Sequence, residues 1–115
     1  MKVIIAGSRF YDDYSYVTKV IKDSGFNITE VVSGGATGVD RLGERYAQEN
    51  KFMLKLFPAD WAKHGKAAGP IRNQKMAEYA EALIAIRINN SRGTTDMINR
   101  ATKMGLKVHV EEIGR

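Results

Sequence analysis

Short apolar runs alternate with segments of helical spacing along this chain, and no other feature of the sequence constrains the fold as strongly. Continuous apolar runs bounded by turn residues are typical of strands buried in a parallel sheet, whereas apolar residues three and four positions apart mark one face of a helix. The run at 52–57 is interrupted by Lys55, which indicates a strand at the edge of the sheet. We predict strands at 3–6, 28–32, 52–57, 82–88 and 107–110.

Helical segments follow or precede each of these runs. Gly25 and Gly105 are expected to end two helices, and Pro70 suits the first turn of another because its fixed φ is helical. Residues 59–69 have no clear period, so we predict a loop that crosses the carboxyl edge of the sheet, the edge at which the strands end. The expected helices cover 14–24, 39–47, 70–80 and 97–104.

Strand and helix joined by short loops imply a parallel sheet covered by helices on both faces. A chain of 115 residues with 43% hydrophobic side chains fits one compact domain over residues 1–115. We therefore predict a three-layer α/β domain with a five-stranded, mainly parallel sheet. Ligands of such domains bind beyond the carboxyl ends of the strands.

Charge and cysteine content limit the functional classes. Subtracting 13 Asp and Glu from 18 Lys and Arg leaves a net charge of +5, which suits an anionic partner such as a nucleotide or nucleic acid; mixed surface charge that only maintains solubility is the alternative. The chain has no cysteine, and His64 and His109 lack ligand spacing, so we expect neither a metal nor a resident cofactor. The apolar start is too short for a signal segment or a membrane span, so we expect a cytoplasmic protein with no membrane partner.

A glycine-rich turn follows the second predicted strand and runs Ser33-Gly34-Gly35-Ala36-Thr37-Gly38-Val39-Asp40. Glycine lets the backbone adopt positive φ and approach a ligand closely, and a helix N-terminus directs partial positive charge at the same place. The turn therefore predicts an anion site, most often for phosphate. The alternative interpretation of this turn is an ordinary capped helix, because Thr37-x-x-Asp40 fits a variant capping box. Capping alone, however, does not require three glycines.

Three further segments are expected at the same edge. Gly7-Ser8-Arg9 follows the first strand, and Arg9 could bind phosphate or ribose or could be an ordinary surface arginine. Arg72 and Asn73 begin a helix, where a cation is electrostatically disfavoured unless an anion compensates it. Hydroxyls and N–H groups of residues 91–94 suit phosphate at another helix N-terminus. The candidate ligand-binding residues are Gly7, Ser8, Arg9, Ser33, Gly34, Gly35, Ala36, Thr37, Gly38, Asp40, Arg72, Asn73, Ser91, Gly93 and Thr94.

These motifs are not a standard nucleotide fingerprint, since neither G-x-G-x-x-G nor the P-loop pattern is present. In order along the chain the motifs are Gly7-Ser8-Arg9, Ser33-Gly34-Gly35-Ala36-x-Gly38-x-Asp40, Pro58-Ala59-x-Trp61, Ala68-Gly69-Pro70-x-Arg72-Asn73-x-x-Met76 and Ser91-x-Gly93-Thr94. Together they resemble the SLOG superfamily, and within it the small stand-alone YspA-like family. Smf/DprA DNA-processing proteins and LOG nucleotide hydrolases are other members. The resemblance implies a Rossmann-like domain that binds nucleotides or nucleotide-derived ligands and self-associates as a homo-oligomer.

One position departs from the hydrolase pattern. The resemblance implies a catalytic glutamate where this chain has Met97, and methionine cannot perform acid–base chemistry. Asp96 lies one position earlier on a helix, about 100° around it, and is expected to face elsewhere. Our leading hypothesis is therefore a nucleotide-binding module that acts as a sensor or sequestering protein, with Trp61 as a candidate for stacking on the base. The alternatives are a LOG-like nucleotide N-glycosidase that uses an aspartate, and single-stranded DNA binding of the DNA-processing type.

Overall fold

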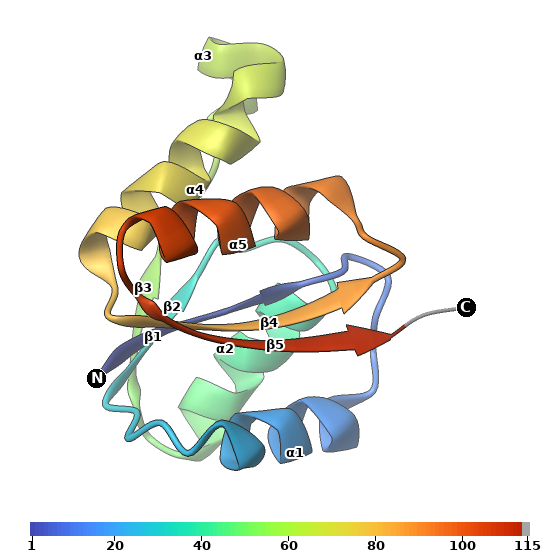
Figure 1. Ribbon diagram of the computed structural model, residues 1–115, viewed down its shortest axis with the longest axis vertical. Coiled ribbons are helices and arrows are strands. Elements are labelled where there is room, and N and C mark those ends of the chain that lie inside the picture. Colours follow the sequence, from blue (N-terminus) through green and yellow to red (C-terminus); the bar gives the residue numbers. More distant parts are fainter. Residues whose placement is uncertain (114–115) are drawn as a thin grey trace.

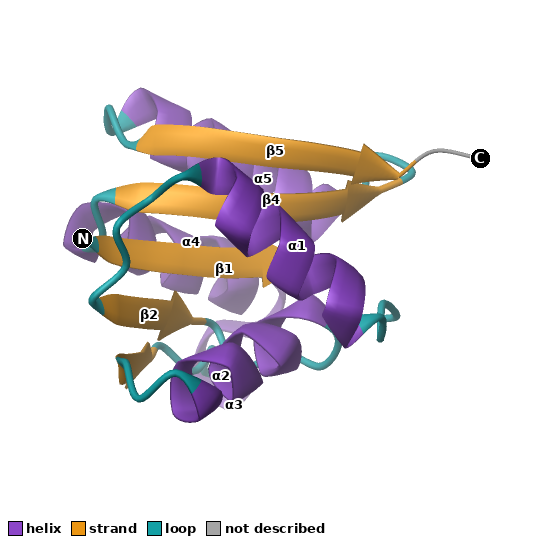
Figure 2. Cartoon of the chain, turned by 90° about the horizontal axis from the view of Figure 1, so that it is seen from below, coloured by secondary structure: helices purple, strands orange, loops and turns teal. Residues whose placement is uncertain are grey.

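Five strands form one sheet in the order β3-β2-β1-β4-β5, and all four pairings are parallel (Figures 1 and 2). The computed structural model describes residues 1–113 of the chain. The predicted parallel sheet and the edge position of the third strand are confirmed. The observed strands begin and end within a few residues of the predicted ones: β1 (Lys2–Gly7), β2 (Glu30–Ser33), β3 (Met53–Leu56), β4 (Ala82–Ile88) and β5 (Lys107–Ile113).

Helices cover both faces of the sheet, which confirms the predicted α/β architecture (Figures 1 and 2). Local sequence determines where they begin and end. The Asp13 side chain accepts the N–H of Tyr16 ahead of the first helix, and Gly25 ends that helix at φ +72°. The helices are α1 (Tyr14–Ser24), α2 (Val39–Glu49), α3 (Trp61–His64), α4 (Ala68–Tyr79) and α5 (Arg92–Lys103), and the 3₁₀ helix η1 (Gly65–Ala67) joins α3 to α4.

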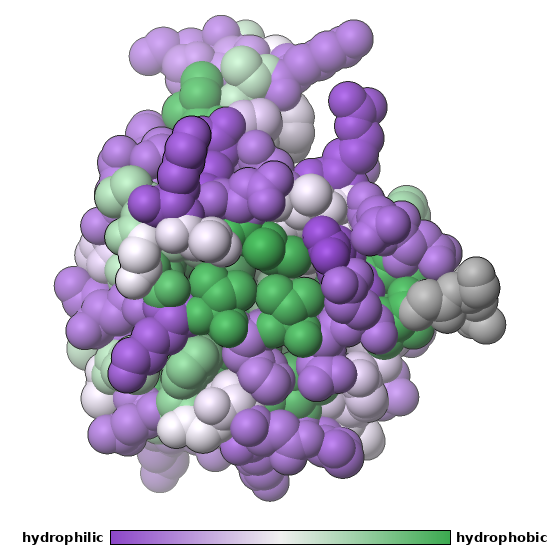
Figure 3. All heavy atoms as spheres, viewed as in Figure 1, coloured by the Kyte–Doolittle hydropathy of each residue, from purple (hydrophilic) through white to green (hydrophobic). Residues whose placement is uncertain are grey.

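The prediction of a loop over 59–69 is wrong, because this segment is mostly helical. The Asp60 carboxylate accepts the N–H of Lys63 and caps α3, and η1 continues directly into α4 at Ala68. No residue of α3 is buried, so the segment has no apolar period that sequence reasoning could detect. Hydrophilic side chains predominate on the projecting lobe that α3 and η1 form (Figure 3).

The core has two halves, one on each face of the sheet. Val3 and Ile5 of β1 belong to the half under α1 and α2, whereas Ile4 and Ala6 belong to the half under α4 and α5. The first three of these residues are fully buried, and burying each such side chain stabilises the fold by roughly 1.5–3 kcal/mol. The alternation of β1 between the two halves makes it the centre of the fold.

The strand order places a topological switch point between β1 and β4, because the chain proceeds from β1 to β2 on one side and later adds β4 on the other. The loops after β1, β2 and β4 and the N-termini of α2, α4 and α5 all lie at the carboxyl edge of the sheet. Gly7, the last residue of β1, pairs with Ile86 and packs so closely that an added Cβ would collide with the Ile86 carbonyl oxygen. Within residues 1–113, no helix has the length and apolar character that a membrane span requires.

Candidate functional site

The loop after β1 is hydrogen-bonded to the glycine turn after β2. Thr37 Oγ1 donates to the carbonyl oxygen of Arg9 at 3.1 Å, and the N–H of Val39 donates to that of Ser8 at 3.0 Å. Gly38 has φ +75°, and a Cβ there would overlap the backbone of Ser8 and Arg9. Gly38, not Thr37, is the N-cap residue of α2 and has no side chain to cap it. The capping-box alternative is therefore wrong, because the Thr37 hydroxyl joins two loops instead.

Buried polar side chains shape the inside of the glycine turn. Ser33 is fully buried; its Oγ accepts the N–H of Gly35 at 3.1 Å and donates to Glu44 at 2.7 Å. Asp40 is 5% exposed and accepts the N–H of Ala36 at 3.2 Å. Burial raises the pKa of Asp40 to about 6, although the Ala36 N–H and the nearby Arg72 charge favour its ionised form. The turn thus contains a buried carboxyl group with a raised pKa.

Arg72 extends from α4 to this turn. Its Nη1 donates to the carbonyl oxygen of Gly34 at 2.6 Å, and its Nε donates to Asn73 Oδ1 at 3.0 Å. A Cβ at Gly34 would collide with the guanidinium and approach Asp40, so a side chain here would force the guanidinium to move from its present position. Burial lowers the pKa of Arg72 and the charge of Asp40 opposes that shift; the side chain remains a cation at physiological pH.

Asn73 connects α4 to the start of α5. It is 5% exposed, and its Nδ2 lies 2.9 Å from Asp96 Oδ2 and 3.4 Å from the Gly93 carbonyl oxygen. Asp96 also forms an ion pair with Arg100 at 2.9 Å. The structure therefore links the glycine turn, the start of α4 and the start of α5 through direct hydrogen bonds, although they are far apart in sequence.

Other predicted residues lie at the same edge with fewer contacts. Ser91 is the N-cap residue of α5, yet its buried Oγ has no hydrogen-bond partner among residues 1–113. Thr94 is buried, whereas Arg9 is exposed to solvent. Met97 is 1% exposed and belongs to the core half under α4 and α5. The position at which hydrolases of the superfamily would place a glutamate is therefore in the core.

Trp61 is separated from the other candidates. It is 58% exposed on α3, and its ring lies beside Gly69. Stacking of Trp61 on a base stays a prediction.

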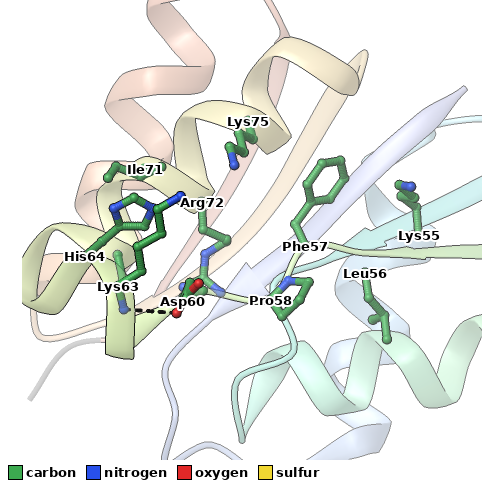
Figure 4. Close-up of a pocket in the computed structure, with 12 residues that line it drawn as sticks. Lys55, Leu56, Phe57, Pro58, Asp60, Lys63, His64, Ile71, Arg72 and Lys75 are labelled. Carbon is green, nitrogen blue, oxygen red and sulfur yellow. Dashed lines mark hydrogen bonds between the residues drawn. The ribbon is translucent and has the colours of Figure 1, made fainter.

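A hollow of about 370 Å³ opens beside Arg72, between the end of β3 and the helices α3 and α4 (Figure 4). Arg72 is the one predicted ligand-binding residue that lines it. Sequence reasoning missed the hollow because its walls come from three separate elements and follow no local motif. In the part of the chain that the structure describes, no three His, Asp or Glu side chains gather in a way that could hold a metal ion.

A parallel sheet of this order, with glycine-containing loops at the switch point, defines a Rossmann-like domain. Residues 1–64 match the model of the YspA, cpYpsA-related SLOG family. The chain belongs to this SLOG family, which confirms the resemblance noted from its motifs.

The chain is also similar to two other proteins. It is 34% identical over 117 residues to the Gene 61 protein of Mycobacterium phage D29, and the match covers 93% of each chain. Its fold matches that of DNA processing protein A (DprA) from Streptococcus pneumoniae with a TM-score of 0.77 at 20% identity. That match covers 95% of this chain but only 49% of DprA, so the chain spans about half the length of that protein. At this identity the likeness establishes the fold.

Proposed function

We propose that this protein binds a nucleotide, or a phosphorylated nucleotide derivative, at the carboxyl edge of its sheet and acts as a sensor or sequestering protein. The observation that carries the proposal is the convergence of loops at that edge, where Arg72 bonds to Gly34 and Asn73 bonds to Gly93. Membership of the SLOG family supports a nucleotide- or DNA-related role in general. Because hydrogen bonds hold these loops close together, the site favours a single small ligand that several loops contact at once.

The phosphate is proposed to bind at the N-terminus of α2. Among residues 1–113 the N–H groups of Thr37 and Gly38 have no hydrogen-bond partner, and unpaired N–H groups at a helix start are suited to phosphate oxygens. The Thr37 hydroxyl holds the backbone of Arg9 next to them. Arg9 is exposed and could add a bidentate, charge-assisted contact.

Cleavage of the nucleotide has less support. Met97 is buried in the core, and Asp96 is already bonded to Asn73 and Arg100. Neither residue offers a free carboxylate for an oxocarbenium-like transition state. Incubation with nucleoside monophosphates, followed by chromatography for free base, separates binding from N-glycosidase activity; release of base would favour the enzyme.

Calorimetric titration tests the proposal directly, with a panel of nucleoside mono- and diphosphates, cyclic nucleotides, dinucleotides and ADP-ribose at low salt. We expect saturable binding of at least one of them. Absence of binding across the panel would overturn the proposal. A gel shift with single-stranded DNA that appears while the panel gives no signal would favour the nucleic-acid alternative, since phosphate contacts are strongest at low salt.

A pair of arginine variants makes the test specific. Arg9 and Arg41 are both exposed and lie near the start of α2. Arg9→Gln should weaken nucleotide binding about ten-fold or more, because it removes a charge-assisted phosphate contact, whereas Arg41→Gln should leave the affinity nearly unchanged. Equal effects of the two variants would indicate attraction by general positive charge alone.

A further inference from the structure

The hollow beside Arg72 has strongly basic walls. Lys63 and His64 of α3 and Arg72 and Lys75 of α4 form one side, and the other side follows the chain from Lys55 through Pro58 (Figure 4). We call this hollow the basic groove. Its volume of about 370 Å³ is in the range of small-molecule sites.

Within residues 1–113, the three lysines of the basic groove have no carboxylate paired with them, whereas Arg72 lies near Asp40. Lys55, Lys63 and Lys75 form no ion pair within the described residues. Asp60, which also caps α3, is the single acidic residue on the walls, so one negative charge faces three lysines and Arg72. A cluster of like charges in one hollow is unfavourable on its own and becomes favourable when an anion occupies it.

Apolar side chains complete the walls. Phe57, Pro58 and Ile71 line the groove beside the cations. The three lysines are exposed to solvent, so the attraction of each one for an anion is modest and decreases with salt, and binding depends on several cations that act together. The side chains that line the groove suit a charged ligand, because three flexible lysine ammonium groups can contact several phosphate oxygens.

Arg72 connects the basic groove to the glycine turn. Its side chain lines the groove, while its guanidinium donates to the Gly34 carbonyl oxygen at 2.6 Å. Arg72 is therefore the residue that the basic groove and the glycine turn share.

We propose that the ligand is a nucleoside polyphosphate, whose first phosphate binds at the glycine turn and whose further phosphates bind in the basic groove. This inference rests on the proposed nucleotide-binding function and deepens it, because it specifies at least two phosphates. The groove lysines contact the phosphates beyond the first and contribute to affinity only when those phosphates are present.

The test compares AMP, ADP, ATP and inorganic tripolyphosphate by calorimetry in buffer with EDTA. The groove variant combines Lys55→Gln, Lys63→Gln and Lys75→Gln. The control variant combines Lys22→Gln, Lys103→Gln and Lys107→Gln; these exposed lysines lie outside the groove, so the control loses the same total charge. We expect the wild-type protein to bind ATP about ten-fold or more tightly than AMP.

The three proteins then give distinct outcomes. The groove variant should bind ATP and AMP with affinities within about two-fold of each other, while the control variant keeps most of the wild-type difference. AMP and ATP binding equally to the wild-type protein, or a difference that survives in the groove variant, would overturn this inference and leave nucleotide binding intact. If tripolyphosphate binds to the wild-type protein and not to the groove variant, while none of the nucleotides binds, the result would instead overturn the proposed function.

Discussion

Arg72 Nη1 donates a 2.6 Å hydrogen bond to the carbonyl oxygen of Gly34, a residue 38 positions earlier in the chain. This contact joins the start of α4 to the turn after β2. It also sets a steric condition, because the guanidinium occupies the space that a side chain at position 34 would need. The two residues therefore depend on each other for both packing and hydrogen bonding.

Replacing Gly34 with alanine should destabilise the fold. The new Cβ would overlap the Arg72 guanidinium, which can move away only by breaking its hydrogen bond to the Gly34 carbonyl oxygen, and losing a hydrogen bond from a charged group costs about 1–3 kcal/mol. Gly93→Ala is the matched control, since a Cβ there meets open space within α5. Replacing a helical glycine with alanine should stabilise the protein by about 0.4–1 kcal/mol. Urea unfolding measures both; a Gly34→Ala protein as stable as the wild type would contradict the packing described above.

Asp40 should make stability depend on pH. Burial raises its pKa to about 6, against an ordinary value of 3.8, so between these pH values the folded protein keeps a proton that the unfolded chain has lost. Its contribution to stability is therefore present at low pH and lost as the pH rises through about 6, with a change of at most about 3 kcal/mol.

Asp40→Asn removes this dependence while keeping an oxygen that can accept the Ala36 N–H. Relative to wild type, the variant should become more stable as the pH rises from 4 to 8. Urea unfolding across this range provides the free-energy difference at each pH. A difference that stays constant with pH would show that Asp40 titrates normally.

Asn73→Ala should loosen the junction of α4 and α5. The substitution leaves the carbonyl of Gly93 and the carboxylate of Asp96 without the Asn73 amide. Both residues reach solvent, so the expected cost is that of the lost hydrogen bonds, about 1 kcal/mol each. Glu78→Ala on the exposed side of α4 is the control and should change stability by less than about 0.5 kcal/mol. Equal effects in thermal or urea unfolding would argue against a structural role for Asn73.

Met97→Glu should not create a hydrolase. Met97 is 1% exposed, so the glutamate would have to enter an apolar core and would destabilise the protein by several kcal/mol. Met97→Leu conserves volume and should cost less than about 1.5 kcal/mol. The readouts are unfolding free energy and release of free base from nucleoside monophosphates; a stable Met97→Glu protein that releases base would show that position 97 reaches the ligand site.

Several features could be predicted because their causes are local. Apolar runs revealed the strands, Lys55 indicated the edge strand, and Gly25 ended α1 as expected. The helix α3 was missed because it buries no residue and so has no apolar period. The capping-box alternative for Thr37 was wrong because its hydroxyl bonds to Arg9, which is distant in sequence.

The five strands, the four longer helices and the family follow from the sequence alone, since each of these elements and motifs depends on residues within a few positions of one another. How those motifs meet depends on the tertiary structure. Only the packing of α4 against the sheet brings Arg72 to Gly34, and only the folding of β3, α3 and α4 around one hollow gathers Lys55, Lys63 and Lys75. These contacts depend on how whole elements cross over one another, and no short stretch of sequence encodes that.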